Sequence, residues 1–89
     1  SYIRECDVCA VVTRCDDRRI YAVQRNKFYR GDTLEILAPK AVPVPVTVND
    51  LKNGEGEPVE DTRHAAMELS FENTTGTIFP VGAIVRKPV

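Results

Sequence analysis

The sequence predicts an all-β domain, a small closed or partly open β-barrel of six to seven short strands. Short runs rich in Val, Ile, Thr and aromatic residues recur along the chain. Clusters of Gly, Pro, Asp and Asn separate them at intervals of roughly eight to twelve residues, which is typical of sandwiches and barrels. No segment supports a helix of normal length.

The size of the chain limits what it can do. Its 89 residues make one small domain, 1–89, with a radius of gyration of roughly 12 Å and no room for a deep cleft between lobes. No apolar run approaches the roughly 20 residues of a membrane span, so we predict a cytoplasmic domain without a membrane partner. Because the chain begins with Ser1 and not Met, we expect a fragment of a longer protein.

The charge balance argues against a free-standing nucleic-acid binder. The net charge is −1, with eight Lys or Arg against six acids in residues 1–40 and four against seven in residues 41–89. Such a binder carries a strong basic field. A local basic patch remains compatible with this sequence.

The first 24 residues predict a hairpin. Residues 2–15 are rich in β-branched residues, Cys and Tyr and form one long strand. Residues 16–19 are a turn, because two adjacent acids are poor strand formers and good turn formers. Residues 20–24 return as the second strand.

The segment AVQRNKFYRGDTLEIL, residues 22–37, organises the rest of the chain. The second strand breaks at residues 25–27, and a third strand follows at residues 33–37. The turn between them needs positive φ, which Gly31 tolerates because it has no Cβ. Asp32 is expected to bond nearby backbone donors and to fix the bend.

The remaining segments predict an edge strand, a loop and two more strands. Residues 42–48 read VPVPVTV and suit a sheet edge, because proline cannot donate to a neighbouring strand. Residues 49–63 predict an acidic loop with a short helical turn at residues 49–52, capped by Asn49. Residues 65–71 alternate with period two, and residues 78–87 form the last strand, with Gly82 marking a bend or bulge.

The cysteines do not predict a metal site. A zinc ribbon needs a second ligand pair beside the CxxC of Cys6 and Cys9, and only Cys15 and His64 remain. Positions three apart on a strand point to opposite faces, and Cys9 and Cys15 lie about 20 Å apart along the strand. We therefore predict free thiols and no cofactor in this fragment.

A catalytic centre is not predicted either. A hydrolytic triad needs a nucleophile aimed by a base and an orienting group. His64 follows Asp61 by three residues, but the serines are Ser1, at the terminus, and Ser70, expected to point off a strand. A pair of Cys and His64 stays open as an alternative. The acids of residues 50–61 lack the spacing of a calcium loop.

The best candidates for binding a substrate or RNA are Arg25, Lys27, Phe28, Tyr29 and Arg30. Cations contact phosphate, and aromatic faces stack bases or cover an apolar groove. A structural interpretation competes with this one and is favoured: Phe28 fills the barrel, and Arg25 and Asn26 bond the backbone where the strand breaks.

Three segments together resemble a known family. They are residues 22–37, GEGEPVEDTRH at residues 54–64 and FPVGAIVRK at residues 79–87. They are similar to the C-terminal domain of the collagenase-like peptidase family U32, with its V-Q-R-N-[KR]-F-x-x-G-D-x-[LV]-E-I unit, D-G-E-P-[IV]-E loop and closing basic motif. The resemblance runs from about Cys9 to the end. Ala65 stands where the family has a Pro, and Gly82 where it has an Asp.

The resemblance implies a barrel similar to those of translation factors, joined to a larger upstream α/β-barrel catalytic domain. It implies that the catalytic residues and any iron–sulfur cluster belong to that domain, and none to Cys6, Cys9 or Cys15. Members of the family are described as proteases, and relatives hydroxylate RNA or quinones. The parent is thus expected to be a peptidase or a hydroxylase acting on a protein or RNA substrate.

The domain itself is expected to be a non-catalytic lid or substrate guide that docks on the upstream catalytic domain. We place the dock at an apolar rim around Tyr29, Val44 and Phe79. The alternative is an RNA-binding barrel of a U32-like RNA hydroxylase.

Overall fold

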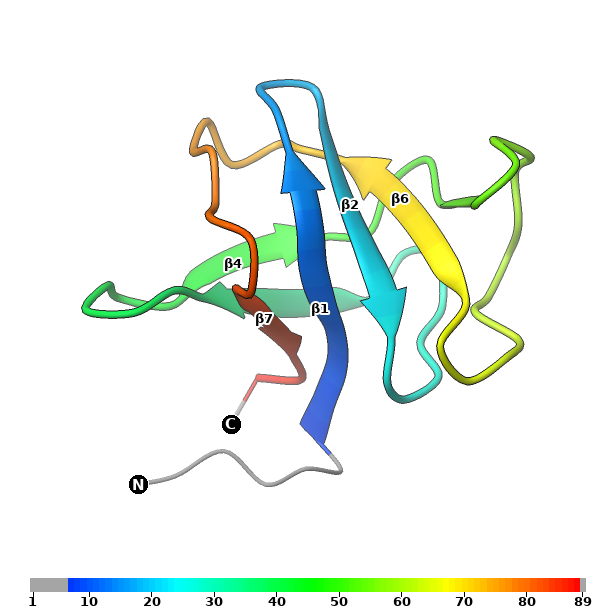
Figure 1. The fold of residues 1–89 in the computed structure, drawn as a ribbon, viewed down its shortest axis with the longest axis horizontal. Helices are drawn as coiled ribbons and strands as arrows, with labels where there is room; N and C mark the ends of the chain where they lie inside the picture. Colours follow the sequence, from blue (N-terminus) through cyan, green and yellow to red (C-terminus); the bar gives the residue numbers. More distant parts are fainter. Residues whose placement is uncertain (1–6, 89) are drawn as a thin grey trace.

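The strands form a single antiparallel sheet that curls on itself into a half-barrel (Figure 1). The structure is a computed structural model and describes residues 7–88. Among these, the sheet order is β4-β3-β7-β1-β2-β6-β5. The strands are β1 (Val8–Cys15), β2 (Arg19–Gln24), β3 (Thr33–Leu37), β4 (Val44–Thr47), β5 (Lys52–Asn53), β6 (Glu68–Glu72) and β7 (Ile84–Arg86). The predicted all-β, partly open barrel is confirmed.

The first hairpin follows the prediction where the structure describes it. Residues 2–6 of the predicted long strand lie outside the described residues, and β1 begins at Val8. At the turn, Asp16 Oδ1 accepts hydrogen bonds from Arg18 N at 2.8 Å and Arg19 N at 2.7 Å. The register with β2 shifts between Val12 and Arg14, so β1 carries a bulge there.

Two elements differ from the prediction. The helical turn predicted at residues 49–52 is wrong, because this stretch leads into β5, where Lys52 pairs with Ser70 of β6. The Asn49 carbonyl accepts from Glu72 N at 2.9 Å. The last strand is also shorter than expected. Gly82, at φ +94°, closes the predicted bend, and only residues 84–86 after it form a strand.

The inner face of the half-barrel holds one hydrophobic core. Period-two alternation puts every second residue of β2 and β3 inside. Phe28 and Phe71 meet edge to face, with ring centroids 6.5 Å apart. The radius of gyration is 11.6 Å. Buried hydrophobic residues are Cys9, Ala10, Val12, Ile20, Ala22, Phe28, Leu34, Ile36, Val46, Val48, Leu51, Leu69, Phe71, Phe79, Ala83 and Val85.

The predicted edge strand is confirmed as β4, which pairs only with β3 in the described sheet. Val48 N donates to Asp32 O at 2.9 Å. Because amides alternate in direction along an antiparallel strand, positions 43 and 45 face the free side. Both are prolines, so neither presents a donor there.

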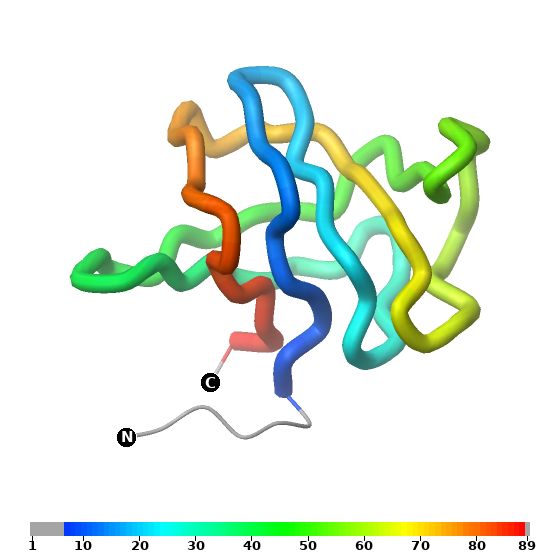
Figure 2. The backbone as a smooth tube through the Cα atoms, in the orientation of Figure 1, coloured from blue at the N-terminus to red at the C-terminus, as the bar shows by residue number. Residues whose placement is uncertain are grey.

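The start of β1 and the end of the described chain lie on the same side of the molecule (Figure 2). Residues 7–88 include no helix with the length and apolar character required to cross a bilayer.

Candidate functional site

The segment between β2 and β3 carries the predicted binding residues, and β1 holds its first half in place. Asn26 Nδ2 donates to Val8 O at 2.7 Å. The backbone amides of Arg25 and Asn26 donate to Cys9 O at 2.7 and 3.2 Å. Asn26 is therefore structural, as the structural interpretation of this motif predicted.

Phe28 and the following turn are structural as well. Phe28 is wholly buried, so its ring is not on the surface. Gly31 has φ +92°. Tyr29 N donates to Asp32 Oδ2 at 2.9 Å, and Asp32 N donates to Tyr29 O at 3.1 Å. Gly31 thus adopts the positive φ of this turn, and Asp32 bonds the backbone of Tyr29.

The three cations of the segment do not act as one positive patch. Lys27 Nζ lies 3.5 Å from Asp61 Oδ2 and 5.4 Å from the ring centroid of Tyr29. Arg30 pairs with Glu60 at 2.9 Å. Exposed ion pairs add little stability, but these two cancel positive charge at the surface. Arg25 is exposed and has no ion-pair partner among residues 7–88.

The groups considered for catalysis are dispersed. Cys9 lies in the core, where burial raises the pKa of its thiol above the ordinary value of 9.0. Ser70 Oγ accepts hydrogen bonds from Arg19 Nε at 3.2 Å and Arg19 Nη2 at 3.1 Å. His64 is exposed on a loop. Within the described chain, no three His, Cys, Asp or Glu residues gather in a way that could hold a metal.

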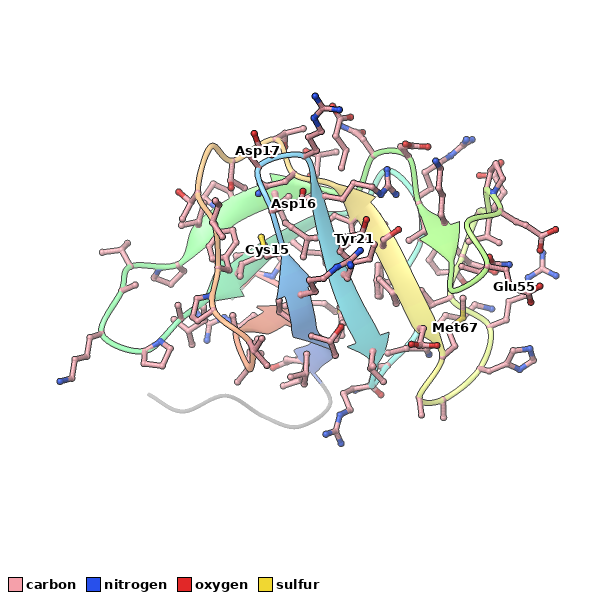
Figure 3. The ribbon with its side chains drawn as sticks, turned by 45° about the horizontal axis from the view of Figure 1, so that its top comes forward. Cys15, Asp16, Asp17, Tyr21, Glu55 and Met67 are labelled. Carbon is pink, nitrogen blue, oxygen red and sulfur yellow. The ribbon has the colours of Figure 1, made fainter. Side chains whose placement is uncertain are left out.

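An open cleft of about 930 Å³ lies between the acidic loop and the chain that leads to β6. Glu55 and Met67 line it (Figure 3). Arg30, Arg63 and His64 line it too. Carboxylates and guanidinium groups are mixed on its walls, so the cleft presents no single charge to a ligand.

A second depression of about 1080 Å³ runs along the β1–β2 face. We call it the β1–β2 groove. Its lining is mainly Val and Ala, with one cation, Arg25, and the polar residues Thr13, Gln24 and Asn26. The lining includes Val8, Val11, Val23, Arg25, Ala65 and Ala66.

The apolar surface differs from the predicted rim. Phe79 is only 5% exposed, and Val44 packs against the core, so neither supplies a docking surface. Tyr29, at 50% exposure, is the one predicted rim residue that faces solvent. Among residues 7–88, the other large exposed apolar side chains are Val42, Ile78 and Val81.

Several structural residues are not evident from the sequence pattern. Thr62 is wholly buried against Phe28. Asn73 ties the first hairpin to the chain before β7, because its Nδ2 donates to Asp16 O at 2.9 Å and to Thr77 O at 2.8 Å. The available signal was an Asn in a Thr- and Gly-rich turn, a residue that often bonds local backbone.

The geometry defines a class of protein: an open antiparallel half-barrel whose candidate ligand-binding features lie on its surface. The sequence model of a family described as Peptidase family U32 C-terminal domain matches residues 4–86. The chain therefore belongs to that family, and the resemblance found in the sequence is confirmed. Membership in a family of C-terminal domains implies an upstream domain in the same chain.

Two solved structures share the fold. Both are of the C-terminal domain of a Geobacillus thermoleovorans protein assigned to the U32 peptidases. One covers 100% of both chains with a TM-score of 0.86 at 19% identity. The other, a selenomethionine variant, covers 91% of this chain and 99% of its own, with a TM-score of 0.82 at 19% identity. Among curated proteins, none matches this sequence.

Proposed function

We propose that this chain is a non-catalytic accessory domain that docks on the catalytic domain upstream in the same chain and acts there as a lid or substrate guide. The parent enzyme is a collagenase-like peptidase of the U32 type, working in the cytoplasm on a protein substrate. The observation that carries the proposal is the match of residues 4–86, nearly the whole chain, to a family of C-terminal domains.

Physical considerations support an accessory role. The groups able to do chemistry are held apart, with Cys9 in the core and His64 on an exposed loop. A nucleophile needs a base within hydrogen-bond reach. What the domain offers instead is surface, including the open cleft beside the acidic loop and the β1–β2 groove. In this proposal it uses no cofactor of its own.

Deletion of the domain from the full-length enzyme tests the proposal. We expect kcat/KM on gelatin or a collagen peptide to fall roughly tenfold, mainly through KM, because a lid or guide acts on substrate capture. The isolated domain alone is expected to cleave nothing. Unchanged kcat/KM after deletion argues against an accessory role, and cleavage by the isolated domain overturns the non-catalytic assignment.

RNA binding by a domain of a U32-like RNA hydroxylase is the second candidate. It is favoured by Tyr29, whose ring is half exposed with the Lys27 ammonium 5.4 Å from its centroid. The pairing of Lys27 and Arg30 with acids weighs against it. If it is right, affinity for RNA falls steeply with salt and is lost in the triple alanine variant of Arg25, Lys27 and Arg30. A flat salt response eliminates it.

A further inference from the structure

The outward face of the sheet carries a row of apolar side chains. The register places Leu37 opposite Ile84, Ile84 opposite Val11, and Val11 opposite Val23. Directly opposed residues on neighbouring antiparallel strands share a face. The row, which we call the apolar row, therefore runs without interruption across β3, β7, β1 and β2.

The core does not use this row. Neighbours of its members along the strands, Ile36, Val85, Val12 and Ala22, are at most 1% exposed. Because successive side chains point to opposite faces, the row points outward. Its four members are only partly buried and belong neither to the core cluster nor to the side chains packed against it.

The β1–β2 groove lies at the end of the row formed by Val11 and Val23. Its rim is the loop of Ala65 and Ala66, two small exposed residues. Ala66 has φ +62°, a conformation that L residues rarely adopt. Its amide donates to Gln24 O at 3.1 Å, which holds the loop beside β2. The rim is therefore fixed in position and leaves the groove open.

The lining of the groove also carries a positive charge. Arg25 lines the groove and has no acidic partner among the described residues, whereas Lys27 and Arg30 in the same segment each have one. An acidic group on whatever covers the groove would complete this pattern. The surface thus combines apolar side chains with polar groups and one cation, as interfaces between domains commonly do.

We propose that the apolar row and the β1–β2 groove are the face on which the upstream domain of the same chain packs, with a carboxylate opposite Arg25. This inference rests on the proposed function. The occupant is identified by its tether: the upstream chain joins before β1, and Val8, the first residue of β1, lines the groove. A tethered partner has an effective concentration on the order of millimolar, so it covers an adjacent apolar face ahead of free partners.

The test uses the full-length protein with two substitutions in the groove, Ala65→Trp and Arg25→Glu. Both positions are exposed, so the fold should tolerate them. The matched control carries Ala41→Trp and Arg18→Glu, which make the same chemical changes at exposed positions that do not line the groove.

The readout is amide hydrogen exchange in the full-length protein. We expect exchange of residues 8–11 and 23–26 to rise roughly fivefold or more in the groove variant and to stay unchanged in the control. Amides of Ile20 and Ala22, in the core of β2, should stay protected in both and so report an intact fold. Equal exchange in the two variants overturns the inference.

Two further measurements distinguish the upstream domain from a second copy as the occupant, and the docking interface from the lid or guide role. Protection of the groove that depends on protein concentration would mean that a second copy covers it, which overturns the inference. Activity is measured on the same preparations. Loss of docking with unchanged kcat/KM supports this interface while contradicting the lid or guide role. Unchanged docking contradicts the interface and leaves the deletion experiment to decide the role.

Discussion

Phe28 and Thr62 exchange hydrogen bonds between two loops that are 34 residues apart in sequence. Phe28 N donates to Thr62 Oγ1 at 3.0 Å, and Thr62 N donates to Phe28 O at 3.0 Å. Both residues are wholly buried. This exchange fastens the segment between β2 and β3 to the acidic loop, and it keeps Asp61 and Glu60 beside Lys27 and Arg30.

Replacing Thr62 by Val should destabilise the domain. The change keeps the volume but leaves the Phe28 amide buried without a partner, at an expected cost of about 1–3 kcal/mol in the free energy of unfolding. The matched control is Thr33→Val on the exposed face of β3, with an expected change of less than about 0.5 kcal/mol. Urea titration measures both. Equal effects in the two variants would mean that the hydrogen bond contributes nothing.

Gly31 should tolerate Asn better than Ala. A Cβ at this position meets no atom within 4 Å, so any cost of substitution comes from the backbone at φ +92°. We expect Gly31→Ala to lower the free energy of unfolding by about 1–2 kcal/mol, and Gly31→Asn by less, because Asn adopts positive φ more readily. Thermal melting of both variants provides the comparison. An Asn variant as unstable as the Ala variant would contradict this reasoning.

The hydrogen bonds to the Asp16 carboxylate should make the free energy of unfolding depend on pH in the acidic range. Hydrogen bonds from Arg19 N, and then from Arg18 N, hold the pKa of Asp16 below its ordinary value of 3.8. Above pH 3.8 this stabilisation is fully present, and it is lost as the pH falls through the lower folded pKa. The stability difference between wild type and Asp16→Asn should therefore shrink over this range.

A neighbouring carboxylate provides the control for that titration. Asp17→Asn removes an equally exposed charge that accepts no hydrogen bond among the described residues. Urea midpoints at several pH values from about 6 down to about 2.5 make the comparison. If the stability difference between wild type and Asp16→Asn stays constant with pH, the ionised Asp16 carboxylate does not stabilise the turn.

Cys9 and Cys15 should differ in reactivity. The thiolate is the reactive form, and burial raises the pKa of Cys9 and also shields its sulfur. Cys15 is half-buried near the first turn. With iodoacetamide at pH 8, peptide mass spectrometry should show Cys15 alkylated at least about tenfold faster, because Cys9 reacts only through opening of the fold. In urea, the two cysteines should be alkylated at comparable rates. Comparable rates in the native protein would mean that Cys9 is not in the core.

Local turn chemistry explains why much of the fold was predictable. Gly31 with Asp32 and the paired acids after Cys15 dictate bends that depend on a few neighbouring residues. Alternation then assigns the inner face of each strand, as Leu34 and Ile36 show. The prolines in the VPVPV segment likewise identify an edge without knowledge of the partner strand.

Long-range pairing explains the errors. Asn49 is a good helix cap by residue type, yet its carbonyl bonds to Glu72 N, and this pairing is invisible in the local sequence. The position of Phe79 in the core also depends on distant contacts, because its amide donates to Cys15 Sγ at 3.4 Å. From the local sequence alone, Phe79 was predicted to lie in an exposed apolar rim.

The candidate binding residues likewise combine features that the local sequence predicts with features that depend on long-range contacts. Their identities came from the sequence, but the acids that neutralise Lys27 and Arg30 lie about thirty residues further on and meet them only through the fold. The apolar row depends on register across four strands. A one-residue slip of any strand would send its member of the row into the core.

Pro43, just before β4, and Pro45, within it, affect how this domain contacts other molecules. With no donors at positions 43 and 45, that border of the described sheet offers few amides to an added strand, and the opposite border, β5, is only two residues long. Backbone pairing with an added strand is therefore disfavoured at both edges of the described sheet. A stable neighbour is therefore expected to contact this domain mainly through side chains, so substitutions at exposed side chains should change which partner it accepts.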